Sequence, residues 1–280
     1  FHPASPLELA VTHPAAFIGL PAAFVLATYA GALSMTRREA VGVAMCMRLY
    51  NAAQVVLCAY VVAGLSDVVG FPNVLGINSV FTPAAEWFIF VHYLSKYLDW
   101  FDTLFMLLRK RRSQLSFLHV YHHSSIAVIW GLLCYTGNGN GTVRFGAWIN
   151  SLTHVLMYAH YLWTSFGWRN PLKGLLTTWQ VVQFYCCFAH SVVVLFLEDS
   201  ELDRRFAWIQ FFYQLTMIYL FTCQLHWVPS WVPDFGELKS NGVAVGGKAQ
   251  RLARPSDHDL PCMLHSDKRG KREQSANKEE

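Results

Sequence analysis

The chain has 280 residues, of which 54% are hydrophobic and only 14% are charged. Its mean hydropathy of +0.27 is too high for an ordinary soluble domain, so the composition predicts an integral membrane protein. The formal net charge is +4, and nine of the 22 Lys and Arg lie after residue 232. The seven cysteines fall almost entirely in apolar runs, which indicates membrane-buried thiols rather than a disulfide framework.

Seven apolar runs are long enough to cross a bilayer, which takes about 20 residues. Short polar or Gly/Pro-rich connectors separate the runs, a pattern typical of an α-helical bundle. The predicted fold class is all-α, a polytopic bundle of seven transmembrane helices over residues 15–232. The runs cover residues 15–34, 41–64, 84–108, 117–136, 145–166, 175–197 and 206–228.

Orientation follows from the Lys and Arg of the connectors, because cytosolic loops are enriched in both. One side of the membrane receives most of them, whereas the other side receives only Arg144, Arg204 and Arg205. The N-terminus is therefore predicted to be lumenal and the C-terminus cytosolic. Since the chain starts at Phe1 rather than Met, we expect residues 1–14 to be a truncated lumenal segment. Residues 233–280 are expected to form a disordered basic cytosolic tail.

An ionisable side chain inside a membrane span costs free energy, so its presence in a predicted span indicates a functional role. In "KYLDWFDT", Lys96, Asp99 and Thr103 share roughly one helical face, and Asp102 lies beside Asp99 at i, i+3. A buried ion pair that only fixes helix geometry is the competing interpretation of Lys96 and its carboxylate.

The fourth span carries "HVYHH", in which three histidines fall at i, i+3 and i+4. His119, His122 and His123 therefore share one helical face, and we expect all three to point into one cavity. At 1.5 Å per residue, His122 and Asp102 lie at a similar depth, about 8 to 9 Å from the cytosolic end.

The fifth and sixth spans add hydrogen-bonding groups at helical spacing. The convergence predicts a reaction chamber in the cytosolic half of the bundle, although intramembrane amides and hydroxyls also tie helices together. The groups are Asn150, His154, Tyr158 and Tyr161 in "NSLTHVLMYAHY", and Thr177, Gln180 and Gln183 in "TTWQVVQF".

A histidine box of this kind supports two chemistries. Membrane di-iron desaturases and hydroxylases need about eight ligands in several boxes, but the other histidines here are scattered singly. Acyl transfer is favoured, because a neutral imidazole attacks thioesters and an acyl-imidazole in an oily cavity is shielded from water. A third alternative, a non-enzymatic seven-helix receptor, gives no reason for three clustered histidines inside the membrane.

Four motifs in order resemble those of the ELO family of very-long-chain fatty acid elongases. The family's K-x-x-E-x-x-D-T, H-x-x-H-H, N-x-x-x-H-x-x-M-Y-x-Y-Y and T-x-x-Q-x-x-Q-F correspond to "KYLDWFDT", "HVYHH", "NSLTHVLMYAHY" and "TTWQVVQF". "QLSFLHVYHH" is similar to the branch that acts on polyunsaturated acyl chains. Two positions depart from the pattern: Asp99 replaces Glu, and His160 replaces a Tyr and is expected to pack.

The resemblance implies an acyltransferase, a 3-ketoacyl-CoA synthase that condenses long-chain acyl-CoA with malonyl-CoA and releases CO2 and CoA. His122 is the implied nucleophile and His154 its partner near malonyl-CoA decarboxylation. The other implied catalytic residues are His119, His123 and Asp102. The implied substrate-binding residues are Lys96, Asp99, Thr103, Asn150, Tyr158, Tyr161, Gln180 and Gln183.

The resemblance also implies a multi-pass protein of the endoplasmic reticulum membrane. It implies no metal and no cofactor, with acyl-CoA and malonyl-CoA as substrates. Membrane lipid is an implied partner. Candidate protein partners are the reductases and dehydratase of the elongation cycle and a second copy of the chain. Nucleic acid is not an expected partner.

Overall fold

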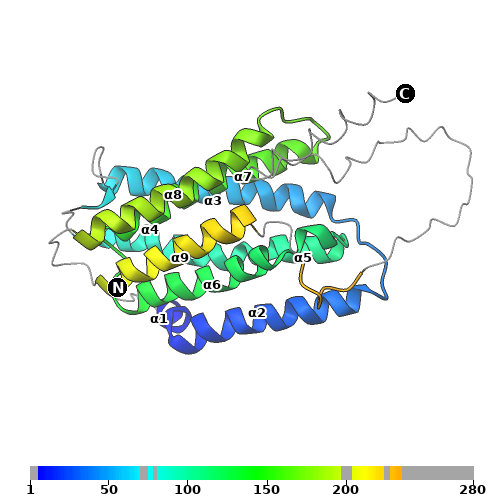
Figure 1. Cartoon of the computed structure of the whole chain (residues 1–280), viewed down its shortest axis with the longest axis horizontal. Helices are drawn as coiled ribbons and strands as arrows, with labels where there is room; N and C mark the ends of the chain where they lie inside the picture. The colour runs from blue at the N-terminus through cyan, green and yellow to red at the C-terminus, as the bar shows by residue number, and fades with distance from the viewer. Residues whose placement is uncertain (1–5, 70–74, 78–80, 197–203, 224–227, 235–280) are drawn as a thin grey trace, which may run out of the picture. The chain divides into compact units, whose positions relative to one another are not determined.

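The structure is a computed structural model that describes residues 6–69, 75–77, 81–196, 204–223 and 228–234. Within these ranges every regular element is a helix (Figure 1). The predicted all-α class is confirmed. The long elements are α2 (Pro14–Met35), α3 (Ala44–Val69), α4 (Pro83–Leu98), α6 (Phe117–Tyr135), α7 (Val143–Ser165), α8 (Lys173–Phe196) and α9 (Arg204–Cys223), and the short ones are α1 (Pro6–Thr12), α5 (Trp100–Leu108) and the 3₁₀ turn η2 (Arg112–Gln114).

Local capping sets where the helices of the site begin. The Ser116 hydroxyl accepts a hydrogen bond from the amide of His119, 3.2 Å away, so α6 begins one turn before the histidine box. Thr82 caps α4 in the same way through the amide of Ala85, and Pro83 occupies the first helical turn, where it needs no amide hydrogen. These caps fix the register of the polar side chains that follow.

The third predicted span, 84–108, is not one uninterrupted helix. It divides at Asp99 into α4 and α5, although Asp99 keeps helical angles (φ −59°, ψ −18°). The amide of Asp102 bonds the Asp99 carbonyl, an i→i−3 contact that tightens the turn. The interruption lies in the motif that carries both carboxylates.

The helices pack in neighbouring pairs, α3 with α7, α8 with α9 and α2 with α6, and α9 also contacts α6 (Figure 1). The main apolar core lies between α4, α6 and α7, where Ile89, Tyr93, Trp130 and Ala147 are buried. This packing leaves α6, α7, α8 and α9 around one common space, which holds the candidate site.

The outer faces of the helices are apolar. Leu26, Leu49, Val56, Phe196 and Phe212 are each at least 60% exposed, which suits contact with lipid rather than water. Five helices, α2, α3, α6, α8 and α9, are long and apolar enough to cross a membrane. α4 and α5 are only 16 and 9 residues long, and α7 carries the polar groups of the site. The chain is therefore a helical membrane protein, and the count of seven spans stays a prediction.

An arginine is buried at the end of the bundle where α4 and α7 begin. Arg144 is 2% exposed, and its Nε donates to Oδ1 of Asn140 at 3.0 Å, with a second bond from Nη2 to the same oxygen. Asn140 donates in turn to the Thr82 carbonyl. These contacts join the connector before α7 to the start of α4.

The sequence also led to predictions about the two ends of the chain and the cysteines. The predicted N-terminal segment contains α1, a helix of seven residues. The predicted tail lies outside the described residues from 235 onward. Six cysteines fall in the described part of the chain, and all six are free thiols.

Candidate active site

Asp99 is the centre of a buried polar cluster. Its Oδ2 lies 3.1 Å from Nζ of Lys96, and both side chains are almost fully buried. Its Oδ1 accepts from Nε2 of Gln54 at 2.8 Å and from the Tyr158 hydroxyl at 3.0 Å. Helices α3, α4 and α7 therefore meet at one carboxylate.

Asp102, one turn further along α5, shares the Tyr158 hydroxyl with Asp99. That hydroxyl lies 2.7 Å from Oδ2 of Asp102, and it has one proton for two carboxylates. Tyr50 of α3 contacts the Tyr158 hydroxyl at 3.1 Å. Of the two carboxylates Lys96 pairs with Asp99 alone, so within the described chain Asp102 has no ion-pair partner.

The three histidines of the box have different surroundings. His119 bonds Thr103 of α5 through Nε2 at 2.7 Å, and its ring lies 4.1 Å from that of His123. His123 is 9% exposed, and its carbonyl accepts from the Trp100 indole. His119 and His123 therefore fill the contact between α6 and α5 rather than the cavity.

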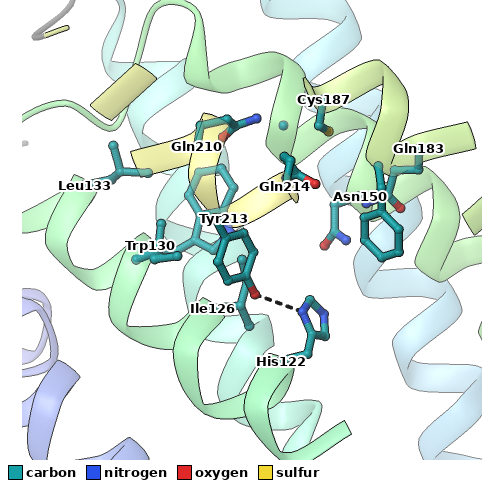
Figure 2. Close-up of a pocket in the computed structure, with 13 residues that line it drawn as sticks. His122, Ile126, Trp130, Leu133, Asn150, Gln183, Cys187, Gln210, Tyr213 and Gln214 are labelled. Carbon is teal, nitrogen blue, oxygen red and sulfur yellow. Dashed lines mark hydrogen bonds between the residues drawn. The ribbon is translucent and has the colours of Figure 1, made fainter. Parts of the chain in front are cut away.

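His122 is the member of the box that lines a cavity between α6, α7, α8 and α9. Its Nδ1 lies 3.0 Å from the hydroxyl of Tyr213 on α9 (Figure 2). The Tyr213 hydroxyl accepts a hydrogen bond from Ser125 at 3.3 Å. The expectation that all three histidines point into one cavity holds only for His122 among the residues that line it. The His119 ring turns toward α5, and the His123 ring packs against the His119 ring.

The cavity is mostly apolar and has a volume of about 40 Å³. His122 lies at one end and Gln210 at the other (Figure 2). Asn150 joins the cavity to the polar cluster, because its Oδ1 accepts from Lys96 at 3.0 Å. The lining residues are His122, Ile126, Ile129, Trp130, Leu133, Gly146, Asn150, Gln183, Phe184, Cys187, Gln210, Tyr213 and Gln214.

His154 lies at the edge of the polar cluster. Its Nδ1 is 3.7 Å from Oδ2 of Asp99, an ion-pair distance only if the ring is protonated. The side chain is 7% exposed, and Nδ1 has no hydrogen-bond partner in the described part of the chain. A buried ring nitrogen without a partner is available to a substrate group.

The remaining predicted residues divide between the cavity and other contacts. Gln183 lines the cavity, whereas Gln180 donates to the Met157 sulfur, 3.0 Å away, and is not among the lining residues. Tyr161 is 40% exposed and contacts the ring of Tyr158. His160 lies 2.7 Å from Asn170 in the connector after α7, so it has the packing role expected of it.

Sequence reasoning missed five polar residues of the site. Two lie on α3 and three on α9, in runs that are otherwise apolar. Helical spacing was the available signal, because members of each set lie three or four residues apart and share a face. The residues are Tyr50 and Gln54 on α3, and Gln210, Tyr213 and Gln214 on α9.

The arrangement does not favour the di-iron alternative. Across the described ranges, no group of three or more His, Cys, Asp or Glu is placed to hold a metal ion. In the box, His119 and His122 use a ring nitrogen for a hydroxyl of Thr103 and Tyr213. The geometry instead presents one imidazole to an apolar cavity.

Comparison with known proteins places this site within a family. The family described as ELO, GNS1/SUR4, matches residues 9–226, which include all of α2 to α9. The chain belongs to the ELO family. The predicted resemblance is confirmed, and both the cavity and the polar cluster lie inside the matched region of this ELO protein.

Individual relatives agree with this membership. "Fatty acid elongase 5" of Leishmania major is 49% identical over 175 residues, or 62% of this chain and 70% of that protein. "Fatty acid elongase 5" of Trypanosoma cruzi is 44% identical over 187 residues, 67% of this chain and 73% of that protein. "Very long chain fatty acid elongase 4" of Homo sapiens is 31% identical over 245 residues, 80% of this chain and 75% of that protein.

Proposed function

We propose that this ELO protein is a fatty acid elongase, a 3-ketoacyl-CoA synthase that condenses long-chain acyl-CoA with malonyl-CoA. The observation that carries the proposal is the position of His122, a half-buried imidazole at one end of a mostly apolar cavity. The names of the relatives, which are fatty acid elongases, support the same activity.

His122 takes the acyl group in the first step. A ring nitrogen attacks the thioester carbonyl carbon, the carbon–sulfur bond breaks, and CoA leaves as a thiol after taking the proton that the ring loses. Tyr213 contacts Nδ1, so Nε2 is the nitrogen that faces the acyl group. The apolar lining excludes water, which protects the acyl-imidazole from hydrolysis.

Malonyl-CoA consumes the acyl-imidazole in the second step. Loss of CO2 leaves a carbanion, which attacks the acyl carbon. The carbon–nitrogen bond to His122 breaks, the ring keeps that electron pair and takes up a proton from solvent, and 3-ketoacyl-CoA is released. His154 stands beside this step because its unpartnered Nδ1 can hold a polar substrate group near Asp99. Lys96 and Asn150 link this cluster to the cavity.

The acyl chain occupies the cavity beyond His122. The volume of about 40 Å³ holds roughly three waters, since one water needs about 10 to 15 Å³. A long chain therefore enters only as the lining side chains move apart. Phe184, Tyr213 and Gln214 come from α8 and α9, the helices that must move relative to α6.

The proposal includes the seven-span topology in the endoplasmic reticulum membrane, with a lumenal N-terminus and a cytosolic C-terminus. The substrate end then faces the cytosol, where the Lys and Arg of the connectors lie. Polyunsaturated acyl chains are the proposed substrates. Membrane lipid, the reductases and dehydratase of the cycle, and a second copy of the chain are the proposed partners, without a metal or nucleic acid.

The test incubates purified, detergent-solubilised protein with labelled malonyl-CoA and a panel of saturated and polyunsaturated acyl-CoAs. Labelled 3-ketoacyl-CoA is the expected product, with no added iron or reductant. His122→Ala is expected to abolish it. His160→Ala is the matched control, since that histidine contacts Asn170 outside the cavity and should retain activity.

Two outcomes would contradict the proposal. Folded protein that makes no 3-ketoacyl-CoA from any chain is not this enzyme. Stoichiometric bound iron, together with oxidation of an acyl chain that needs an electron donor, would assign the histidine box to a di-iron desaturase or hydroxylase.

A further inference from the structure

A second cavity lies one to two helical turns beyond the first. Its volume is about 20 Å³, and it lies between α7, α8 and α9. Gln210 is the residue that lines both cavities. The second cavity is lined by Thr142, Val143, His190, Ser191, Val194, Phe206, Ala207 and Gln210.

The two cavities follow one line through the bundle. On each shared helix, the residues of the second cavity lie further from His122 than those of the first: Val143 beyond Gly146 on α7, Ser191 beyond Cys187 on α8, and Phe206 beyond Gln210 on α9. Because α8 runs antiparallel to α7 and α9, all three displacements point to the same end of the bundle. The second cavity therefore extends the first in depth.

Gln210 stands at the junction of the two cavities with a narrow gap beside it. A Cβ placed on Gly146 would lie 3.8 Å from Nε2 of Gln210 and 3.8 Å from the Trp130 ring. The side-chain amide of Gln210 has no hydrogen-bond partner in the described part of the chain, so no hydrogen bond ties it to a neighbouring helix. Gln210 lines the first cavity beside Trp130 and Gly146, and it lines the second beside Phe206 and Ala207.

We propose that Gln210 closes the acyl-chain cavity and sets the longest chain that the enzyme elongates. This inference rests on the proposed elongase function. The four residues from Gln210 to Phe206 span about 6 Å of helix axis at 1.5 Å per residue. An extended acyl chain advances about 1.3 Å per carbon, because its bonds of roughly 1.5 Å zigzag. The depth behind Gln210 therefore takes about four carbons, or two rounds of two-carbon extension.

The test compares chain-length profiles of purified variants, using labelled malonyl-CoA and saturated acyl-CoAs of increasing length. Gln210→Ala joins the cavities, and the longest efficiently used chain is expected to grow by about four carbons. Gln210→Leu keeps a side chain of similar bulk without the amide, and is expected to keep the wild-type limit. Phe212→Ala is the matched control on the same helix, because Phe212 is 60% exposed and should leave the profile unchanged.

Gly146→Ala provides a second variant that acts in the opposite direction. Its methyl group fits at ordinary contact distance and narrows the gap beside Gln210. Turnover of the longest accepted chains is expected to fall severalfold relative to turnover of shorter chains. This variant keeps the inference testable if Gln210→Ala does not fold.

The outcomes separate the two proposals. Active Gln210→Ala and Gly146→Ala proteins with the wild-type length profile would overturn the role of Gln210 and leave the elongase function intact. A lengthened limit in Gln210→Leu would also overturn it, since the bulk of the side chain is what closes the cavity. Wild-type protein that makes no 3-ketoacyl-CoA with any chain would refute the elongase function itself.

Discussion

The hydroxyl of Tyr213 lies 3.0 Å from Nδ1 of His122, so α9 holds the one histidine of the box that α6 presents to the cavity. When one imidazole nitrogen is engaged in this way, the tautomer is set by that hydrogen bond. In the tautomer in which Nδ1–H donates to the phenol oxygen, Nε2 carries the lone pair needed for nucleophilic attack. Ser125 donates to the same oxygen at 3.3 Å and steadies it.

Tyr213→Phe is therefore expected to slow acyl transfer. Loss of the hydrogen bond costs about 1 to 2 kcal/mol, which corresponds to about 5- to 30-fold in rate. The measurement is CoA release from acyl-CoA in a single turnover without malonyl-CoA, which isolates the first step. Tyr185→Phe on the exposed face of α8 should keep the wild-type rate. Equal rates for both variants would show that Tyr213 does not orient His122.

Lys96→Met tests the ion pair at the centre of the polar cluster. The substitution leaves Asp99 buried without its cation, and we expect a loss of about 3 to 5 kcal/mol in the free energy of unfolding. Thermal unfolding in detergent measures the effect. Adding Asp99→Asn to Lys96→Met should restore part of the loss, because the unpaired charge is then gone. A double variant no more stable than the single one would mean that the two side chains do not interact.

The two carboxylates of the cluster should respond differently to neutralisation. Asp102→Asn removes a charge that has no cationic partner in the described chain, so stability should change by less than about 1 kcal/mol. Asp99→Asn leaves the Lys96 ammonium buried without its carboxylate and should cost several times more. Parallel melts of the two variants compare them directly. A larger loss of stability from Asp102→Asn than from Asp99→Asn would contradict this prediction, because the essential charge would then be that of Asp102.

Helix positions were largely predictable from the sequence, because the signals that begin and end a helix lie within a few residues of its ends. Pro83, Ser116 and the polar connectors mark helix ends through backbone chemistry that acts within one turn. The interruption at Asp99 was not predictable, because the residues around it form an uninterrupted helical pattern. Its side chain joins three helices, and that requirement appears only in the packed bundle.

The site residues, too, were predictable only where their contacts are local in the chain. The histidines and the Lys96–Asp99 pair are close in the chain, so their spacing identified them. Tyr213 and Gln54 contact residues 91 and 45 positions away, and no spacing rule links them to their partners. The separation of His122 from His119 and His123 also depends on α5, which hydrogen-bonds the His119 ring and the His123 carbonyl and leaves the His122 ring to the cavity.

A buried contact between Asn140 and Arg144 lies at the end of the bundle away from the histidine box. Asn140 is fully buried, accepts from the Arg144 guanidinium and donates to the Thr82 carbonyl. Asn140→Ala removes the acceptor of a buried charged donor, and we expect a loss of about 2 to 3 kcal/mol in the free energy of unfolding. Asn138→Ala, which loses only contacts to Thr136, is the matched control and should change stability by about 0.5 kcal/mol or less.

Thermal unfolding in detergent reads out both variants, and the chain-length profile adds a second measurement. Neither Asn140 nor Asn138 lines either of the two cavities described above, so the wild-type profile should persist in both variants. Equal melting temperatures for the two variants would show that the Asn140–Arg144 contact does not hold this end of the bundle together. A changed profile in Asn140→Ala would instead mean that the connector before α7 controls the depth of the second cavity, where Thr142 and Val143 lie.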